Sequence, residues 1–474
     1  MSEEYHIEHD SFGEVKIPGW AYWGPQTQRA TDIFKISPLR FPSVFIKSIG
    51  FIKLACAMVN RDSGLLGPGL AGAIITAAQE VIDGKFEDQF PIDIFQAGSA
   101  TPVNMNVNEV IASRANELLT GSKHLKSPVH PNDHVNMGQS TNDVIPSALH
   151  IAACLETEGK LIPHLKSLCN TINKKSETSG HIFKTGRTHL MDALPITLKQ
   201  ELSGWAVQIH HAIGRLEGAL PRLSELALGG TAVGTGVNTL EDFGKRVSGV
   251  LTELTGHNFR AVNNHFEAQS SRDAAVELSG QLKVLASALI KISNDLRLMN
   301  SGPNAGLSEI SLPALMQGSS IMPGKINPVV PEAVRMACVQ VMGNDVIIGM
   351  SNAMGEFQLN AMLPVISYNL LQSITILANA SLLLAEKAIS GFDVNEECML
   401  QLAQKNPVLV TVLNPVIGYD KAAEVVNESR KNNKSVKDIV IERGYLTREE
   451  ADRILDLRTM TGKEQEGPVS NYDV

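Results

Sequence analysis

Polar residues that can do acid, base or carboxylate chemistry gather in a few short stretches of the chain. Residues 318–328 carry Ser319, Lys325 and Asn327 among repeated Gly and Pro residues. This composition, between two helical segments, is typical of an extended, mobile loop, and lids over active sites are built in this way. A flexible linker is the alternative, because spacing alone does not exclude it.

A second polar stretch, residues 98–106, includes Ser99 and Thr101 and precedes a helical pattern that begins near Glu109. Hydroxyl and amide groups, together with free backbone amides at a helix start, suit a carboxylate ligand. A capped helix entry without a ligand is the alternative for this stretch.

A third stretch places neutral donors in a row at Ser140, Thr141 and Asn142. Such groups can hold a carboxylate without introducing a competing ion pair. A plain turn with a helix cap is the alternative.

Histidines occur in two of the polar stretches. His130 and His134 stand four residues apart, a spacing that suits a metal only in a helix, and Pro131 favours a loop there, so we expect no metal site. His189 stands among polar neighbours ahead of a long helical pattern. Histidine is the usual residue for moving protons near neutral pH, although a lone histidine is more often structural.

A glycine-rich stretch, residues 226–238, invites comparison with a phosphate-binding loop. It lacks the Lys-Ser/Thr ending of such loops and follows a helical pattern rather than a strand. We therefore expect a sharp turn between long helices.

Apolar residues recur at alternating spacings of four and three in the middle of the chain, which predicts long helices that pack lengthwise in a bundle. The most regular series is Leu278, Leu282, Leu285, Leu289, Ile292, Leu296 and Met299, and similar series occupy residues 198–223 and 363–384.

These patterns predict an all-α fold, a long-helix bundle with a small amino-terminal β-hairpin at residues 5–17. We expect an amino-terminal, mostly helical domain (1–139), a central long-helix bundle (140–364), and a last part (365–474) with the remainder of the last long helix and a small carboxy-terminal helical domain. The sequence Thr447-Arg-Glu-Glu450 has the pattern of a capping box in that last part.

Composition excludes several classes of function. The net charge of -9 provides no basic stripe for nucleic acid. The five cysteines are widely spaced without a CxxC pair, which indicates neither a disulfide framework nor a zinc site and fits a reducing compartment. The acidic amino terminus has no signal pattern, and no uninterrupted apolar run is long enough to span a membrane, so we expect a soluble, cytoplasmic protein.

Taken together, the segments resemble the fumarase/aspartase superfamily along almost the whole chain. The run Gly318-Ser-Ser-Ile-Met-Pro-Gly-Lys-Ile-Asn-Pro328 is similar to the superfamily signature, and the segments 187–192, 226–236, 265–269 and 414–423 are similar to class II fumarases. The resemblance implies an all-helical homotetramer in which three subunits build each active site, a small dicarboxylate substrate, and reversible hydration of fumarate to malate without a metal or organic cofactor.

The resemblance also implies roles for single residues. Ser319 would take a proton from the carbon beside one carboxylate, with Lys325 stabilising its alkoxide, and His189, paired with Glu332, would assist proton transfer at the departing hydroxyl. Proton loss there generates a doubly charged aci-carboxylate, which aimed donors stabilise in the transition state. The carboxylates would be held by Ser99, Thr101, Ser140, Thr141, Asn142, Thr188, Lys325 and Asn327. A second, non-catalytic dicarboxylate site would involve His130, Asn132 and Asp133.

Two other functions stay open from the sequence. Ala100, Pro102, Thr141 and Asn304 depart from the fumarase pattern, so aspartate ammonia-lyase, which eliminates ammonia from aspartate, is the alternative enzyme. A catalytically silent structural homologue is the alternative of another class, but loss of function should have eroded at least one of the residues expected to act, and all of them are present.

Overall fold

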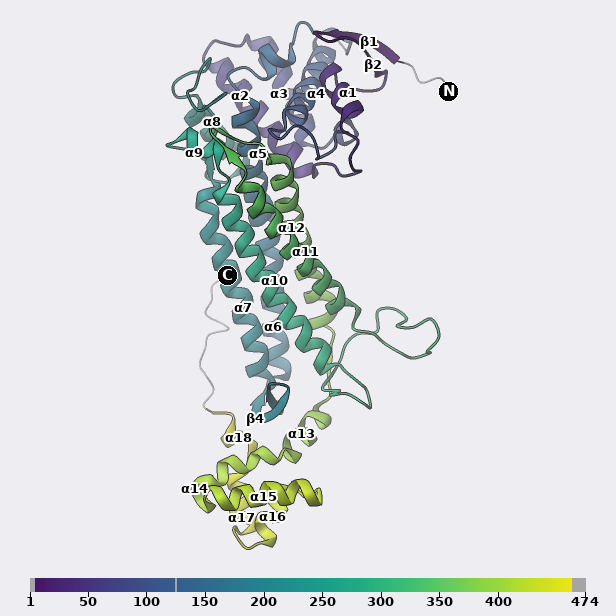
Figure 1. Cartoon of the computed structure of the whole chain (residues 1–474), viewed down its shortest axis with the longest axis vertical. Helices are drawn as coiled ribbons and strands as arrows, with labels where there is room; N and C mark the ends of the chain where they lie inside the picture. The colour runs from purple at the N-terminus through teal and green to yellow at the C-terminus, as the bar shows by residue number, and fades with distance from the viewer. Residues whose placement is uncertain (1–4, 124–125, 463–474) are drawn as a thin grey trace. The chain divides into compact units, whose positions relative to one another are not determined.

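The computed structural model describes residues 5–123 and 126–462, most of which are helical (Figure 1). The chain divides into two compact units that each collect separate segments of sequence. Unit 1 contains residues 1–163, 214–286 and 339–378, and unit 2 contains residues 164–213, 287–338 and 379–474. The expected sequential division after residues 139 and 364 stays a prediction.

The expected amino-terminal hairpin is present in unit 1. β1 (Tyr5–Asp10) pairs antiparallel with β2 (Gly13–Pro18), and Asp10 stands opposite Gly13. In β2, Val15 and Ile17 are buried. An ion pair of 2.8 Å from Arg29 Nε to Asp10 Oδ2 ties the hairpin to α1.

Unit 1 is built mainly on helices of moderate length, and α2 packs against α3, α5 and α8. Its helices are α1 (Pro25–Ile33), α2 (Ser43–Asp62), α3 (Pro68–Ile82), α4 (Thr101–Thr120), α5 (Thr141–Glu156), α8 (Phe243–Thr255) and α9 (His265–Ser270). Two short strand pairs accompany them: parallel β5 (Glu225–Leu226) with β6 (Arg260–Ala261), and antiparallel β8 (Gly355–Glu356) with β9 (Leu359–Asn360).

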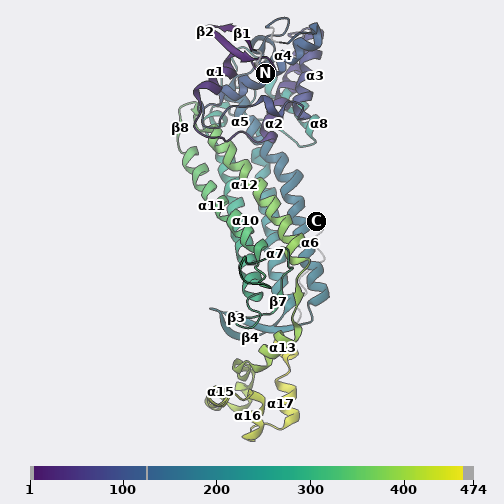
Figure 2. The ribbon, with the colours of Figure 1, turned by 90° about the vertical axis from the view of Figure 1, so that its right-hand side faces the viewer.

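Long helices run from one unit into the other: α6 (Ile162–Ser179), α7 (Leu198–Leu223), α10 (Asp273–Met299), α11 (Val329–Asn352) and α12 (Leu363–Leu384). The three helices predicted from the heptad pattern are confirmed as α7, α10 and α12, and the apolar series from Leu278 to Met299 is buried. Within unit 1, α10, α11 and α12 run side by side (Figure 2), where Ser279 Oγ donates to Asp345 Oδ1 (2.8 Å) and Asn344 Nδ2 to Ser373 Oγ (3.0 Å). The all-α bundle is therefore confirmed.

Unit 2 combines two small antiparallel strand pairs with the last helices of the chain. β3 (Phe183–Thr188) pairs with β4 (Met191–Thr197), and β7 (Ile310–Ser311) pairs with β10 (Asp393–Val394). The helices that follow are α13 (Glu396–Lys405), α14 (Asn414–Ile417), α15 (Tyr419–Asn432), α16 (Val436–Glu442), α17 (Arg448–Ile454) and α18 (Leu457–Met460). They enclose a small core that includes Leu413, Val425 and Ile439, and Thr447 and Glu450 form the expected capping box of α17.

Three local expectations were wrong. α4 begins at Thr101 rather than near Glu109, because Pro102 fits the first turn of a helix and buried asparagines continue it. Residues Pro131–Val135 form one π-helical turn rather than a loop, and Pro131 again occupies its first position. The glycine-rich stretch leads from β5 into the short α8 and does not join two long helices.

Three helical segments are long and apolar enough to cross a membrane by length and composition alone, although we expected none from the absence of an uninterrupted apolar run. They are Ser43–Asp62, Val329–Asn352 and Leu363–Ile389. In the most apolar stretch of each segment, the share of residues buried inside the structure is 72%, 28% and 56%, respectively. α11, which is Val329–Asn352, thus has the smallest buried share of the three, and several of its large apolar side chains are exposed within the chain.

Candidate functional site

The first row of donors lies at the start of α4 in unit 1. Ala100 has a left-handed backbone (φ 64°) and no side chain caps the helix there. Ser99 Oγ lies 3.0 Å from Thr101 Oγ1, and the Thr101 side chain is exposed. A helix start without a side-chain cap, flanked by two hydroxyls, can accept a carboxylate.

The second row lies at the start of α5, also in unit 1. Ser140 is the N-cap: its hydroxyl accepts from Asn142 N (3.3 Å), and its own amide donates to the carboxylate of Asp143 (2.9 Å). Thr141 Oγ1 accepts from Asn104 Nδ2 (3.1 Å), and Asn142 Nδ2 donates to the Ala232 carbonyl (2.8 Å). Ser140 therefore has the capping role that the sequence left open, and Asn104, in α4, links the two rows.

Asp143 fixes the second row against the glycine-rich stretch. Its Oδ2 accepts from the amides of Gly229 (3.1 Å) and Thr231 (2.9 Å). Gly229 has φ 96°, a conformation that glycine adopts without strain. Burial raises the pKa of Asp143 to about 7, and the backbone donors oppose this shift. The glycine-rich stretch thus supports the start of α5.

A buried lysine beneath both rows was missed by sequence reasoning. Lys53 Nζ, in α2, donates to Asn136 Oδ1 (2.8 Å) and to Gln139 Oε1 (2.9 Å). Asn136 Oδ1 also accepts from Asn104 Nδ2 (3.3 Å). Burial lowers the pKa of Lys53 to about 7. A lysine within the apolar sequence Phe51-Ile-Lys-Leu-Ala55 was the available signal.

In unit 2, Thr188 and His189 lie at the tip of the β3–β4 hairpin. His189 and Leu190 form its two-residue turn with φ 56° and 61°, as in a type I′ turn. Both His189 and Thr188 are exposed, and within the described residues the imidazole has no hydrogen bond or ion pair. The ring is therefore presented outward from the hairpin.

A buried carboxylate anchors this hairpin. Glu309 is fully buried; its Oε1 lies 2.8 Å from Arg187 Nη1 and its Oε2 lies 3.1 Å from Lys184 Nζ, both on β3. Lys184 Nζ also lies 3.3 Å from Glu201 Oε2. Two cations at one buried carboxylate hold the strand that leads into Thr188 and His189. Sequence reasoning missed Glu309, because 122 residues separate it from Arg187 and no local pattern connects them.

The serine loop, residues 318–328, is closed by its own hydrogen bonds. The amide of Gly318 donates to the Lys325 carbonyl (3.0 Å), and Asn327 Nδ2 donates to the Gly318 carbonyl (2.6 Å). Ser319 Oγ accepts from the amides of Ile321 (3.3 Å) and Met322 (3.1 Å). Asn327 thus shapes the loop, and two amides are aimed at the serine oxygen.

The remaining residues of the loop region are open to their surroundings. The side chain of Lys325 is exposed, and residues 314–326 border a cavity of about 530 Å³. Glu332 lies half-buried in the first turn of α11. Across the described part of the chain no hydrogen bond or ion pair joins Glu332 to His189, so their expected pairing stays a prediction.

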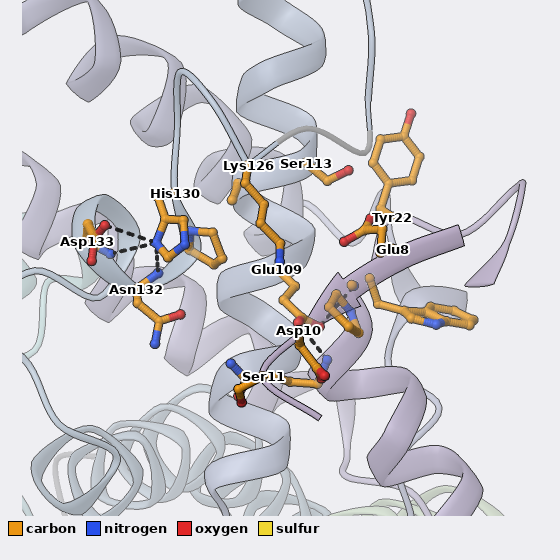
Figure 3. A pocket seen from close by; sticks show the side chains of 16 residues that line it. Glu8, Asp10, Ser11, Tyr22, Glu109, Ser113, Lys126, His130, Asn132 and Asp133 are labelled. Carbon is orange, nitrogen blue, oxygen red and sulfur yellow. Dashed lines mark hydrogen bonds and ion pairs between the residues drawn. The ribbon is translucent and has the colours of Figure 1, made fainter. Parts of the chain in front are cut away.

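The residues expected at a second site line another cavity in unit 1, of about 400 Å³ (Figure 3). His130 Nδ1 accepts from the amides of Asn132 and Asp133, both at 3.2 Å, so the ring caps its own π-helical turn. In Figure 3, Lys126 lies between His130 and the strand that carries Asp10. The other charged residues of the lining are Glu8, Asp10, Glu109 and Asp133, so this wall is mainly acidic.

Among the described residues, no group of three or more His, Cys, Asp or Glu side chains is arranged to hold a metal ion.

Comparisons with known proteins find relatives that match nearly the full length of this chain. A family model described as lyase matches residues 13–343, and one for the fumarase C C-terminus matches residues 409–462. The class II fumarate hydratase of Xylella fastidiosa is 50% identical over 460 residues, 97% of this chain and 96% of the relative. That of Mycobacterium tuberculosis is 50% identical over 469 residues, 98% of each chain. A crystal structure of class II fumarase from Schistosoma mansoni matches with a TM-score of 0.93 at 38% identity, covering 97% of this chain and 99% of that one.

Proposed function

Because the chain belongs to the family of class II fumarate hydratases, we propose that it catalyses the reversible hydration of fumarate to malate. The similarity covers the serine loop, both donor rows and the carboxy-terminal helices, so every segment expected to act lies inside it. The reaction is an anti elimination or addition of water through an aci-carboxylate intermediate, and the enzyme is a hydro-lyase.

Ser319 is the proposed base, and one observation carries this role. In the direction of dehydration its alkoxide takes the proton from the carbon beside one carboxylate, and the electron pair of the broken C–H bond moves into that carboxylate. A serine is a poor base unless its alkoxide is stabilised. The amides of Ile321 and Met322 donate to Ser319 Oγ, and such donors favour the charged form of the oxygen. Lys325 adds a positive charge on the same loop.

The donor rows are proposed to bind the two carboxylates of the substrate through hydrogen bonds. Ser99, Thr101, Ser140, Thr141 and Asn142 supply hydroxyls, an amide and two helix starts in unit 1, and Thr188, Lys325 and Asn327 supply further donors in unit 2. Donors held in place by buried partners lose little order on binding and stabilise the charge that develops on the aci-carboxylate.

His189, with Glu332, is the proposed carrier of the proton that leaves with the hydroxyl group, through a water molecule. Because no contact joins these two residues within the described chain, we place them together across subunits of a homotetramer in which three chains build each site. α11 supports this assembly: Met336, Val339, Val346 and Met350 form an exposed apolar stripe along one face. A long exposed stripe of this kind marks a protein interface.

The second cavity is the proposed place for a non-catalytic dicarboxylate, held by His130, Asn132 and Asp133.

The reducing conditions of the cytoplasm fit the five cysteines, which are all free and of which four are buried. Both statements rest on the family resemblance and on these side chains.

The proposed function is tested by mixing the purified protein with fumarate, with and without ammonium, and identifying the product by NMR. We expect malate in both conditions. Aspartate that forms only with ammonium would replace the hydratase by an ammonia-lyase, and no product in either condition would indicate a silent homologue.

A further inference from the structure

A third cavity, of about 230 Å³, lies in unit 1 apart from every residue discussed above as catalytic or substrate-binding. Its walls come from α5, β5, α9 and the first turn of α10, and they include His150, Glu225, Ala227 and Ala274. Its volume suits a small ion with a few oxygen atoms and is too small for an organic cofactor.

Two polar side chains of this wall are almost completely buried and have unused hydrogen-bonding atoms. Arg272 is 1% exposed, and within the described residues its guanidinium makes no hydrogen bond or ion pair; its Nε is fully buried without a partner. His150 is 8% exposed, and no described residue gives its buried Nε2 a hydrogen-bond partner. Glu267 and Asp273 attract the charge of Arg272, but neither accepts a hydrogen bond from its guanidinium within the described residues, so the hydrogen bonds that the group had in water are not replaced.

The two unused atoms have opposite hydrogen-bonding character. His150 Nδ1 lies 2.8 Å from the Glu225 carbonyl, so this nitrogen carries the proton and Nε2 is left as an acceptor. Burial, and then the charge of Arg272, lower the pKa of His150 to about 3, so the ring is neutral. Arg272, by contrast, can only donate. A matching ligand therefore needs an oxygen that accepts and an O–H group that donates.

The charged residues around the cavity indicate which net charge its ligand should carry. Arg222 is paired with Glu277 and Glu225 with Arg260, so these groups are already compensated. Glu267 and Asp273 face the cavity as carboxylates, and Asp273 Oδ1 accepts from Asn352 Nδ2 (2.7 Å). The start of α10, a helix of 27 residues, favours negative charge at Ala274. Arg272 and the helix start attract an anion, whereas Glu267 and Asp273 also attract Arg272 and repel each added negative charge, so a ligand with one negative charge is favoured over a ligand with two.

We propose that Arg272, His150 and the start of α10 form a binding site for a small, singly charged oxyanion that keeps a proton, the class that includes dihydrogen phosphate and bicarbonate. Arg272 donates to an oxygen of the ion, and the O–H group of the ion donates to His150 Nε2. The site is separate from the proposed dicarboxylate chemistry and does not depend on it.

The test is calorimetric titration of the whole protein with inorganic phosphate and with sulfate, which keeps no proton near neutral pH. We expect saturable phosphate binding that tightens as the pH falls from about 8 to about 6, where phosphate groups gain their second proton. Sulfate should bind roughly tenfold more weakly, because its contact with His150 lacks the hydrogen. Equal binding of the two ions would overturn the requirement for a proton.

Variants assign the binding to this cavity. Arg272→Gln should weaken phosphate binding by roughly tenfold or more, since a hydrogen bond to a charged group is lost. Arg246→Gln is the matched control, because Arg246 donates to Ser63 Oγ and does not line the cavity. Phosphate binding that Arg272→Gln leaves unchanged would overturn the proposal.

His150→Gln provides a second variant that does not remove the cation, in case Arg272→Gln does not fold. It should retain sulfate binding and lose the preference for phosphate over sulfate. A preference that persists in a folded His150→Gln protein would contradict the role of His150 and with it the proposed site.

Discussion

In unit 1 the donors at the starts of α4 and α5 rest on buried polar groups, whereas in unit 2 the serine loop is held by hydrogen bonds within itself. Lys53, Asn104 and Asp143 are all buried and connect the two donor rows to α2 and to the glycine-rich stretch. The serine loop closes through hydrogen bonds among its own residues, which include Gly318, Lys325 and Asn327. The proposed binding groups are thus held by buried partners, and the proposed base lies on a segment that is held by its own hydrogen bonds. A segment of that kind can close over a bound substrate.

The largest effect is expected from the serine loop. Ser319→Ala removes the proposed base, and turnover should fall by roughly 10²–10⁴-fold, the usual contribution of a positioned base. Initial rates of malate formation measure this. Ser320→Ala is the matched control, because Ser320 is its exposed neighbour on the same loop. Near-normal turnover in Ser319→Ala would remove this residue from the role of base.

The next effect concerns the β3–β4 hairpin. Glu309→Gln leaves Lys184 and Arg187 without their shared charge, and breaking a buried ion pair by removing one partner costs about 3–5 kcal/mol. Denaturant unfolding measures the loss of stability, and the rate constant kcat should fall with it because the hairpin carries His189. Glu201→Gln, which alters a more exposed partner of Lys184, should cost clearly less. Equal losses in both variants would count against Glu309 as the anchor.

A smaller effect should appear in unit 1 on acidification. The pKa of His150 is lowered to about 3 from its ordinary value of 6.5. Between these two values the unfolded chain binds more protons than the folded one, so stability present above 6.5 is lost as the pH falls. The free energy of unfolding should therefore fall by at most about 1.4 kcal/mol for each pH unit of acidification.

We compare wild type with His150→Gln by measuring the free energy of unfolding across this pH range. The difference between the two proteins gives the pH dependence that His150 causes. His181→Gln, at an exposed histidine of unit 2, is the control and should keep the wild-type slope. If His150→Gln also keeps it, the buried imidazole is not the source of the acid sensitivity.

The smallest effect is expected in the carboxy-terminal helices. Thr447→Ala removes the hydroxyl that accepts from the Glu450 amide (3.2 Å), and loss of such a cap costs about 1 kcal/mol. Thermal unfolding measures the loss, while turnover should be unchanged because Thr447 belongs to neither donor row nor the serine loop. A fall in turnover would tie these helices to the reaction.

The sequence predicted the parts of the fold in which one side of a helix is buried. α7, α10 and α12 carry a single apolar stripe, and the stripe gave the bounds of α7 and α12, whereas α10 begins at Asp273, ahead of the first residue of its series, Leu278. α11 escaped notice as a long helix because Val334 and Val341 are buried on one side while Met336 and Val339 are exposed on another, so its apolar residues follow no single stripe. The β3–β4 hairpin was missed because its turn, His189-Leu190, lacks the usual Asn-Gly signal.

The site was predicted where chemistry shows in the sequence and missed where it depends on distant partners. Ser319, Lys325 and the hydroxyl-rich rows stand out by composition. Lys53, Asp143 and Glu309 act through residues dozens of positions away, and only the folded chain connects them. The start of α4 was misplaced because Asn104 and its neighbours are weak helix formers that the buried interior of unit 1 stabilises.

The exposed stripe of α11 also has a consequence for how this protein should be assayed. On the proposed assembly, a chain diluted below the dissociation constant of the tetramer loses the neighbours that complete its site, so specific activity becomes a function of enzyme concentration. Progress curves started from dilute stocks should then show a lag that shortens as the stock concentration rises. A rate per chain that stays constant under dilution would indicate an assembly that does not dissociate over the assayed range.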